Sequence, residues 1–418
     1  MDELHADPGS IETADGGPGQ TTLSWKASIE RDVEIRVGSP QGPLFARGGQ
    51  QGSAQTGPWV KDQTAFYLLD AKSGETLATA TVRVKVKPPS LQALSQRMQD
   101  DWDRRSRENA FYYVASSSEA WSEEEFFQSG RQTFEETFRE DMPDICRGRD
   151  PRRMRVLEVG CGVGRILRAA ADEFGEVCGV DVSPEMIRKA RRYTASCSNV
   201  SLFANNGIDL QVLGDRRFDF AYSLLCFQHI PSKQVIEGYI RQTCRLLRPG
   251  GLFKFQVQGF TPLENPPDDT WLGAAFSTEE LTEMAHRCGF QPRRFHGEGS
   301  QYLYVWFYKK GPASLAARPN PVPVKRHEKA QLALTWDAPT AQAVEIRIGS
   351  PTGDLLAKTA PYGTRSIAIP APGKADYFLL DASSLETLAS LIIRTRPAWL
   401  NRVLSWASRS PARNEATK

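Results

Sequence analysis

The 418-residue chain lacks several features that mark common classes of protein. Its seven cysteines are odd in number and show no Cys-x-x-Cys spacing. This predicts neither a disulfide framework nor a zinc site, and it favours a reducing, cytoplasmic compartment. No apolar run is long enough to span a bilayer, and no charged-then-apolar leader begins the chain. The formal net charge is only +2 and no basic stripe carries interleaved aromatic residues, so no nucleic-acid partner is expected.

The length leaves room for two or three domains, each with its own core. Residues 1–19 are rich in Gly, Asp, Pro and Glu, and we expect them to be disordered. Short apolar segments separated by Gly, Pro and Ser turns follow, and they predict a small β-sandwich over 20–87.

Similar sequence segments recur near the other end of the chain, each 311 positions later (33 to 344), so the two copies differ by no net insertion. Such a repeat predicts a duplicated domain, with the second copy over 327–396. Each copy resembles the short immunoglobulin- or fibronectin-like sandwiches of bacterial proteins at the level of architecture. The matching segments are 33–40 with 344–351, 68–71 with 379–382, 75–78 with 386–389, and Trp25 with Trp336.

The stretch from Met154 to Ser183 organises the region between the two copies. An apolar run at 156–159 predicts a strand buried on both faces, and a glycine-rich turn follows at 160–164. A helical pattern then runs to Gly175, a C-terminal glycine cap, and a second apolar strand ends in Asp181. This strand–turn–helix–strand unit predicts a site for an adenosine-containing ligand, with the acid on the ribose hydroxyls.

The spacing of the glycines separates two candidate ligands. Nicotinamide and flavin sites follow Gly-x-Gly-x-x-Gly/Ala, but here Arg165 stands at the last position and the third glycine is Gly164. Glu158 lies two residues before the first glycine, near where a cationic amino-acid group would sit. Gly-x-Gly-x-Gly preceded by an acid, with Asp181 closing the next strand, resembles the class I S-adenosylmethionine-dependent methyltransferases.

The resemblance implies a methyltransferase domain over 88–312 with an N-terminal helical cap, and S-adenosylmethionine as the cofactor. Strands expected at 200–204, 218–225 and 252–257, and a hairpin at 290–295 and 302–308, fit a seven-stranded methyltransferase sheet. The predicted fold is thus multidomain: a central α/β doubly wound sheet between two small all-β sandwiches. The cofactor-binding residues that the resemblance implies are Glu158, Gly160, Cys161, Gly162, Gly164, Asp181, Val182, Met186, Asn206, Gly207 and Leu224.

Among these, Asn206 is preferred over Asn205 for the adenine amino group, and Met186 is expected either over the adenine face or in the core. His229 follows the fourth expected strand, and its ordinary pKa near 6.5 suits a general base, although it can equally shape the loop. The sequence Asn265-Pro266-Pro267-Asp268 is similar to a signature of nucleic-acid amine methyltransferases, but it follows the fifth strand and lacks the aromatic residue. We predict a loop there.

The segments that lead into this domain are expected to be helical from Ser90 to Arg107 and extended at 110–114. A capping box at Ser122 predicts a further helix. Its phenylalanines either form a lid over the donor pocket or are the buried face of the helix, and the second interpretation is favoured. They are Phe126, Phe127, Phe134 and Phe138.

The remaining segments carry weaker patterns. Residues 313–326 are predicted to be a proline-rich linker, and 397–418 a short amphipathic tail that folds back or rests on a membrane surface or a partner. Trp59 is interpreted as a core residue, with sugar stacking as the alternative.

The predicted acceptor is a glycan, a glycolipid or another small molecule. The rivals are a non-catalytic scaffold whose sandwiches bind glycans or proteins, and a nicotinamide-dependent enzyme. The oligomeric state is left open.

Overall fold

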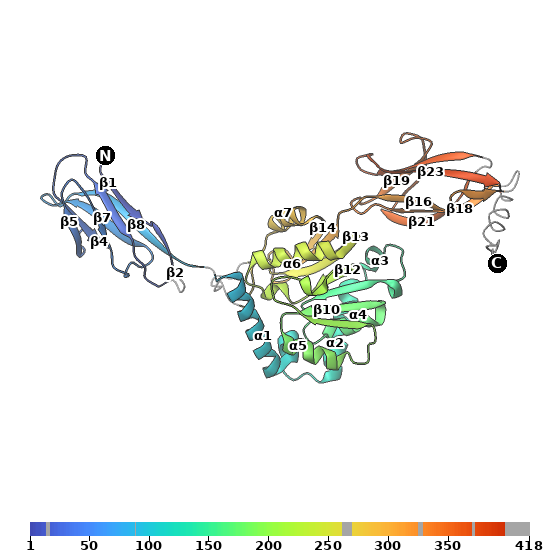
Figure 1. Ribbon diagram of the computed structural model, residues 1–418, viewed down its shortest axis with the longest axis horizontal. Helices are drawn as coiled ribbons and strands as arrows, with labels where there is room; N and C mark the ends of the chain where they lie inside the picture. The colour runs from blue at the N-terminus through green and yellow to red at the C-terminus, as the bar shows by residue number, and fades with distance from the viewer. Residues whose placement is uncertain (14–16, 88, 261–269, 325–328, 370–372, 398–418) are drawn as a thin grey trace, which may run out of the picture. The chain divides into compact units, whose positions relative to one another are not determined.

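The computed structural model describes residues 1–13, 17–87, 89–260, 270–324, 329–369 and 373–397 (Figure 1). The chain divides into two compact units, Met1–Ala93 and Leu94–Lys418. The segment 265–268 and the predicted tail after Pro397 lie outside the described residues. Among the helices that are described, none is long and apolar enough to cross a membrane.

The first unit contains two antiparallel-rich sheets that share one core. Its three-stranded sheet has the order β1-β3-β6 and its five-stranded sheet the order β2-β8-β7-β4-β5. Leu23 and Trp25 from the first sheet meet Ile35, Phe66 and Leu68 from the second in one hydrophobic cluster. The strands are β1 (Glu3–Asp7), β2 (Ser10–Thr13), β3 (Thr22–Lys26), β4 (Val33–Val37), β5 (Leu44–Gly48), β6 (Gln51–Gln55), β7 (Thr64–Asp70) and β8 (Thr76–Val86).

The C-terminal part of the second unit repeats this arrangement strand for strand. The orders are β16-β18-β21 and β17-β23-β22-β19-β20, which correspond to the two sheets of the first copy. The assignment to immunoglobulin- or fibronectin-like sandwiches stays a prediction. The strands are β16 (Ser314–Arg318), β17 (Val322–Val324), β18 (Ala330–Asp337), β19 (Val344–Ile348), β20 (Asp354–Thr359), β21 (Tyr362–Ile369), β22 (Lys374–Asp381) and β23 (Thr387–Pro397).

The predicted start of each copy was wrong. Residues 1–19 contain β1 and β2 instead of a disordered segment, and 313–326 contain β16 and β17 instead of a free linker. The reason is that spaced apolar residues, Leu4 with Ile11 and Leu315 with Val322, fill the two cores. Their numbers differ by the same 311 positions (4 to 315), so each copy begins earlier than its most similar text.

Trp59 is not a core residue. Its side chain is 41% exposed, and its ring lies 6.0 Å from each of the rings of Phe45 and Phe66. Pro370, at the corresponding position of the second copy, lies outside the described residues. Sugar stacking on Trp59 stays a prediction.

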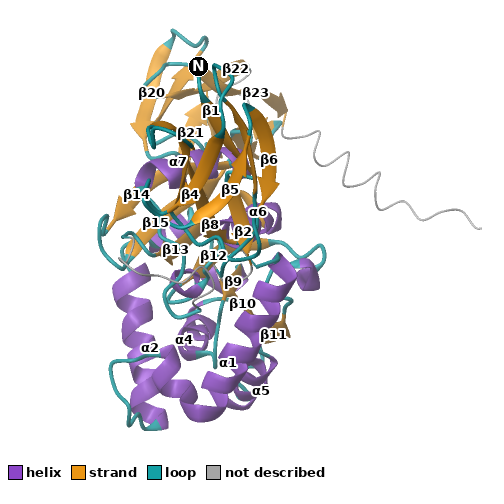
Figure 2. Cartoon of the chain, turned by 90° about the vertical axis from the view of Figure 1, so that its left-hand side faces the viewer, coloured by secondary structure: helices purple, strands orange, loops and turns teal. Residues whose placement is uncertain are grey.

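The central sheet has seven strands in the order β11-β10-β9-β12-β13-β15-β14. The first five run parallel, and β15 is antiparallel to both of its neighbours. The predicted strands and closing hairpin are therefore present (Figure 2). They are β9 (Arg155–Val159), β10 (Glu176–Asp181), β11 (Val200–Ala204), β12 (Phe218–Ser223), β13 (Leu247–Val257), β14 (Phe290–His296) and β15 (Leu303–Lys309).

Helices connect and flank these strands, and their apolar faces complete the core. Serine caps start α5, α6 and α7, where the serine hydroxyl accepts from the backbone N–H of the third helical residue. The helices are α4 (Arg165–Glu173), α5 (Pro184–Tyr193), α6 (Lys233–Leu246), α7 (Thr278–Cys288), the short α3 (Met142–Cys146), and the 3₁₀ turns η1 (Pro151–Arg153), η2 (Gln211–Leu213) and η3 (Phe227–His229).

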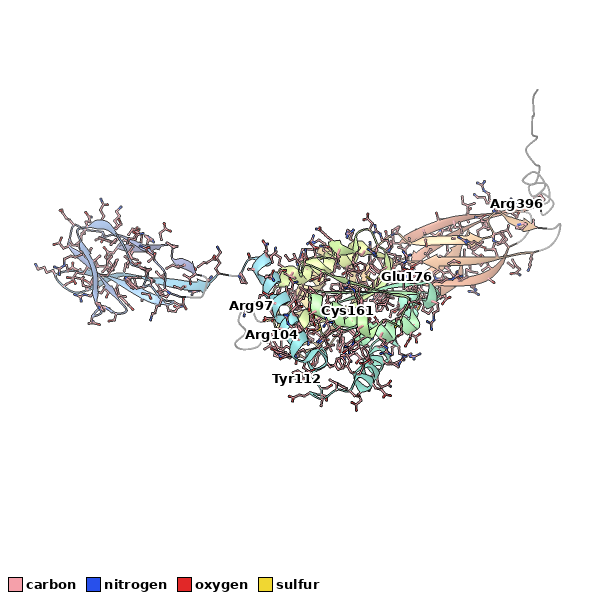
Figure 3. The ribbon with its side chains drawn as sticks, turned by 60° about the horizontal axis from the view of Figure 1, so that its bottom comes forward. Arg97, Arg104, Tyr112, Cys161, Glu176 and Arg396 are labelled. Atoms are coloured by element: carbon pink, nitrogen blue, oxygen red, sulfur yellow. The ribbon has the colours of Figure 1, made fainter. Side chains whose placement is uncertain are left out.

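Two long helices precede the sheet. The segment 110–114, which was expected to be extended, is helical and belongs to α1 (Leu91–Val114). The backbone of Asn109 is not helical and interrupts α1. The Asn109 side chain accepts from the Tyr112 N–H at 3.1 Å and so caps the helical turn that follows. Arg97 and Arg104, which Figure 3 labels, lie on α1, and Arg104 forms an ion pair with Asp101 at 3.3 Å. In α2 (Glu123–Phe138) the capping box is present and the four phenylalanines are buried, which confirms the favoured interpretation.

Inside the second unit, polar contacts join the central domain to the second copy. Buried Arg147 donates from Nη2 to Asp337 Oδ1 at 2.6 Å, and its guanidinium carbon lies 4.5 Å from the centre of the Tyr362 ring. At the corresponding positions the first copy has Lys26 and Gln51 (26 to 337, 51 to 362). A lysine would repel Arg147, so these contacts depend on residues particular to the second copy.

Candidate cofactor and active site

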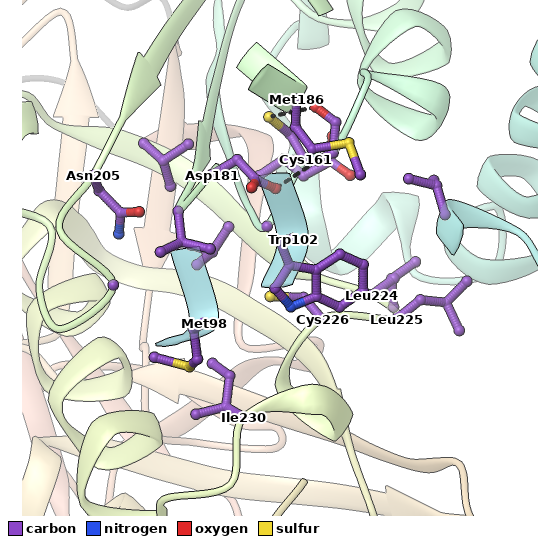
Figure 4. A pocket seen from close by; sticks show the side chains of 18 of the residues that line it. Met98, Trp102, Cys161, Asp181, Met186, Asn205, Leu224, Leu225, Cys226 and Ile230 are labelled. Carbon is purple, nitrogen blue, oxygen red and sulfur yellow. Dashed lines mark hydrogen bonds between the residues drawn. The ribbon is translucent and has the colours of Figure 1, made fainter. Parts of the chain in front are cut away.

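The candidate site is a pocket at the carboxyl ends of β9, β10 and β12, where ligands bind in open α/β sheets. It encloses about 830 Å³ of empty space, its open mouth included. Figure 4 shows Asp181, Asn205, Met186 and Trp102 around it. The lining residues are Met98, Trp102, Tyr113, Val114, Glu158, Val159, Gly160, Cys161, Gly162, Arg165, Ile166, Val180, Asp181, Val182, Met186, Asn205, Gly207, Leu224, Leu225, Cys226, Ile230 and Tyr239.

The glycine turn brings backbone to the pocket wall. Gly160 and Gly162 have positive φ angles of 76° and 52°, which side-chain-bearing residues rarely adopt. A Cβ on Gly160 would lie 2.1 Å from the sulfur of Cys226, and one on Gly162 would lie 2.9 Å from Val114 Cγ2. Gly164, with φ 86°, is the N-cap of α4 and is not among the lining residues. Two of the three predicted glycines thus face the pocket, and the third starts the helix.

Asp181 ends β10 with its carboxylate held by backbone. Oδ2 accepts from the Gly162 N–H at 2.8 Å, and Oδ1 accepts from the Ser183 N–H at 2.9 Å. Burial raises the pKa of this carboxyl to about 6. Each oxygen keeps a further lone pair, so the side chain can accept from ligand hydroxyls without losing its backbone partners.

Glu158 lies in β9 on the floor of the pocket and is only 3% exposed. The Tyr222 hydroxyl donates to its Oε2 at 3.0 Å. Burial raises the pKa of Glu158 to about 8, although the Tyr222 hydrogen bond and the charge of Arg165 oppose the shift. A buried acid whose pKa is raised in this way is a group that a cationic ligand would stabilise.

The preferred asparagine was the wrong one of the pair. The exposed Asn206 is absent from the pocket lining; its Oδ1 accepts from the backbone N–H groups of Ile208 and Asp209, so it serves the turn. Asn205 lines the pocket instead, and its amide nitrogen donates to the Asp209 carbonyl at 3.0 Å. A carbonyl can only accept, so this bond fixes the amide orientation, and it leaves Asn205 Oδ1 buried without a partner among the described residues.

The other predicted lining residues are in the pocket. Met186 is also buried on α5, which agrees with the core interpretation, while its contact with the adenine face stays a prediction. Gly207, with φ 73°, allows the Asn205–Gly207 turn to approach Val182, because a Cβ there would lie 2.8 Å from Val182 Cγ2. Cys161 and Leu224 complete this group.

Sequence reasoning missed the wall that α1 provides. Met98, Trp102, Tyr113 and Val114 line the pocket. The N-terminal helices were expected as a cap, but the wall residues of α1 are spread from Met98 to Val114, more than about four helical turns, and give no motif. Polar contacts fix this wall, as Ser183 Oγ donates to the Asp103 carboxylate of α1.

Both ring nitrogens of His229 are engaged. Nδ1 lies 2.6 Å from the Trp271 carbonyl oxygen, which can only accept, so Nδ1 carries the proton. Nε2 lies 3.1 Å from Gln228 Nε2 and accepts from that amide. The ring is buried, packs against Trp102 at 5.3 Å between ring centres, and is not among the pocket-lining residues. This geometry favours the loop-shaping role over the general base.

The site can therefore hold a ligand that carries vicinal hydroxyls, a cationic group and a donor-bearing heterocycle, as an adenosine linked to an amino acid does. Three observations fit S-adenosylmethionine. Asn205 Oδ1 has no hydrogen-bond partner among the described residues, Gly160 and Gly162 have no room for a Cβ, and Glu158 is a buried acid. In the part of the chain that the structure describes, no group of acidic, histidine and cysteine side chains is arranged to hold a metal ion.

Comparison with known proteins agrees with this class of site. Residues 156–251 match the family model described as a methyltransferase domain. A ubiquinone biosynthesis O-methyltransferase of Methylobacterium nodulans is 29% identical over 117 residues, 26% of this chain and 46% of that protein. A demethylmenaquinone methyltransferase of Tropheryma whipplei is 33% identical over 96 residues, 23% of this chain and 38% of that protein. The chain thus spans less than half the length of these curated relatives.

Solved structures are similar over about half the chain. A magnesium protoporphyrin IX methyltransferase from Synechocystis with bound S-adenosylhomocysteine is 14% identical, with a TM-score of 0.40, and the match covers 51% of this chain and 99% of that one. The family match at 156–251 places a methyltransferase domain in the centre of the chain. Together with the geometry of the pocket, it makes S-adenosylmethionine the cofactor of this domain.

Proposed function

We propose that the chain transfers a methyl group from S-adenosylmethionine to a small-molecule acceptor. The observation that carries the proposal is the convergence of Glu158, Asp181 and Asn205, from three strand ends, on one pocket. When bound, the donor supplies a methyl group on a sulfonium, whose departure leaves a neutral thioether. Asp181 accepts from the ribose hydroxyls, Asn205 Oδ1 accepts from the adenine amino group, and Glu158 pairs with the ammonium group.

The rest of the pocket favours an apolar acceptor over a glycan. Its wall there is formed by Met98, Trp102 and Tyr113 of α1 together with Leu225 and Ile230, and none of these side chains carries a charge. Sugar hydroxyls would lose water on this surface without gaining partners. The two relatives above are named for methylating quinone precursors, which is compatible with such an acceptor.

Titration calorimetry with S-adenosylhomocysteine tests the proposal, followed by donor consumption with fractionated cell extract. Binding with consumption in an apolar fraction supports it. Binding without consumption in any fraction favours the scaffold, and stabilisation by a nicotinamide nucleotide without response to S-adenosylhomocysteine favours the dehydrogenase-type rival.

The raised pKa of Glu158 predicts pH-dependent donor binding. Below about pH 8 the carboxyl of the empty pocket is largely protonated, and the ammonium group must displace that proton. Affinity for S-adenosylhomocysteine should rise about tenfold or more between about pH 6 and pH 8, and Glu158→Gln should bind weakly with a flat profile. Calorimetry in two buffers of different ionisation enthalpy should show proton release; a flat wild-type profile contradicts the assignment.

The same shift sets the stability of the ligand-free protein. The pKa of Glu158 in the folded protein, about 8, exceeds its ordinary value of 4.5, so folding favours the protonated carboxyl. Its contribution to the free energy of unfolding is therefore fully present below pH 4.5 and is lost as the pH rises through about 8.

Replacing His229 should leave catalysis largely intact. With Nδ1 and Nε2 both engaged, the ring has no free lone pair for the acceptor, whereas asparagine can keep the hydrogen bond to the Trp271 carbonyl. Donor consumption by His229→Asn should stay within about fivefold of wild type. A loss of about 100-fold or more, at unchanged S-adenosylhomocysteine affinity and melting temperature, would restore the general-base role.

A further inference from the structure

A chain of hydrogen bonds runs through buried side chains behind the uncharged wall of the pocket. Gln256 Oε1 of β13 accepts from the Leu225 N–H at 3.2 Å, and Gln256 Nε2 donates to Gln228 Oε1. Gln228 Nε2 then donates to His229 Nε2 at 3.1 Å, and His229 Nδ1 donates to the Trp271 carbonyl oxygen at 2.6 Å. The three side chains between the two backbone groups are at most 7% exposed, and none of them lines the pocket.

The two ends of the chain fix the direction of each bond in it. The Leu225 N–H can only donate, so the Gln256 atom that faces it is oxygen, and the amide nitrogen faces Gln228. The same reasoning puts the Gln228 oxygen toward Gln256 and its nitrogen toward His229. The Trp271 carbonyl can only accept, so it takes the Nδ1 proton. His229 is therefore held in one neutral tautomer, which its neighbours on both sides require independently.

Arg105 of α1 adds an electrostatic reason for a neutral ring. Its guanidinium carbon lies 4.8 Å from the centre of the Trp102 ring and 5.3 Å from that of Trp271. The His229 ring packs against the same two rings, at 5.3 Å and 5.0 Å between centres. The carboxylate of Asp101, also on α1, accepts at 2.7 Å from the hydroxyl of the residue before Trp271. A positive charge on His229 would lie beside that of Arg105, so the surroundings favour the neutral ring.

Both ends of the chain belong to the walls of the pocket. Leu225 lines the pocket and has a φ of 53°, a left-handed conformation that residues other than glycine adopt only where their surroundings hold them in it. At the other end, the Trp271 ring packs against Tyr113 at 5.8 Å and against Trp102 at 6.5 Å between centres, and both of those residues line the pocket. The chain thus connects the loop after β12 to the α1 side of the same wall.

We propose that Gln228 and Gln256 are positioning residues for methyl transfer, which act through a neutral His229 to hold the two sides of this wall in the shape that receives the acceptor. The inference rests on the proposed function and adds to it two residues that do not line the pocket. A second proton on His229 would set an N–H against the Gln228 amide nitrogen. Both amides would then have to turn over, and the Leu225 N–H would face an amide NH₂ group instead of an oxygen.

Nitrogen-15 NMR of the histidine rings tests the protonation state that the chain requires. The sequence has five histidines, and His229→Asn identifies the His229 signals by their loss. At about pH 7.5 wild type should show a protonated Nδ1 and an unprotonated Nε2. Gln228→Glu should protonate Nε2 as well, because a carboxylate in that place accepts from His229 while it still accepts from Gln256. Gln291→Glu is the matched control: Gln291 lies on β14 and donates to the Pro292 carbonyl, outside the chain, so the His229 signals should not move.

The rate of donor consumption tests the positioning role. Gln256→Leu removes the oxygen that holds the Leu225 N–H, so turnover at saturating S-adenosylmethionine, in the extract fraction that supports wild-type turnover, should fall about tenfold. The affinity for S-adenosylhomocysteine, measured by calorimetry, should stay within about threefold of wild type. A purely structural role would instead lower this affinity and the melting temperature together.

An Nε2–H tautomer or a doubly protonated His229 ring in wild type overturns the assignment without any variant, even if Gln256→Leu fails to fold. Unchanged turnover in Gln256→Leu, or a parallel loss of its S-adenosylhomocysteine affinity, also overturns it. If wild type binds S-adenosylhomocysteine but consumes no donor in any fraction, the proposed function itself fails and the positioning role fails with it; a confirmed tautomer would then describe the fold of the loop alone.

Discussion

Asp181→Ala is expected to weaken the binding of S-adenosylhomocysteine by about 100-fold or more. The carboxylate is the only acidic side chain at the end of β10, and the proposal gives it two ribose hydroxyls as partners. Losing charged hydrogen bonds of this kind costs about 1.5–3 kcal/mol each, and each 1.4 kcal/mol is a factor of about ten. The affinity is read directly by calorimetry, so an unidentified acceptor does not hinder the measurement.

Two comparisons separate this effect from damage to the fold. Asp181 also accepts from the N–H groups of Gly162 and Ser183, so Asp181→Asn, which keeps one acceptor oxygen, should disturb the turn less and still bind weakly. Asp215→Ala removes a carboxylate whose side chain is 97% exposed, and it should bind like wild type. Wild-type affinity in Asp181→Ala at an unchanged melting temperature would remove the ribose assignment.

The glycine turn was predictable because its backbone conformation determines which residues can occupy it. Gly160 and Gly162 have positive φ angles, which favour glycine, so the residue type there reflects the local backbone conformation. Asp181 was predictable for a related reason: a buried parallel strand that ends in an acid places that acid at the ligand edge of the sheet. These features lie within one short stretch, and no knowledge of distant contacts was needed.

The parts that were missed depend on contacts between distant segments. Whether Asn205 or Asn206 faces the pocket depends on which of the two side-chain amides forms hydrogen bonds within the turn. The sequence pattern does not distinguish two adjacent asparagines. Arg165 gave a signal, as an arginine where a small residue is usual, but its partners Ser129 and Thr133 come from α2. The strands at the start of each sandwich were missed because they contain few apolar residues. Those apolar residues nevertheless recur at the same 311-position offset as the rest of the repeat (4 to 315).

The largest structural effect is expected from Gly160→Ala. The added methyl carbon would lie 2.1 Å from the Cys226 sulfur and 2.4 Å from its Cβ, in a residue whose φ of 76° already disfavours a side chain. Strain and overpacking of this kind each cost about 1–3 kcal/mol, and the displaced turn should reduce S-adenosylhomocysteine affinity about 100-fold.

Gly214→Ala separates the two causes, because its φ is 57° and nothing lies within 4 Å of the added carbon. With φ 57° and ψ −130°, it therefore reports a backbone cost alone, about 1–3 kcal/mol in the free energy of unfolding. Gly160→Ala combined with Cys226→Gly should recover part of the stability lost in Gly160→Ala, since the double substitution removes the clash and leaves the strain. Denaturant unfolding of the wild type and these three variants measures the differences. If Gly160→Ala is no less stable than Gly214→Ala, the close packing of the glycine turn against Cys226 is wrong, and with it the reason given for the first glycine of the motif.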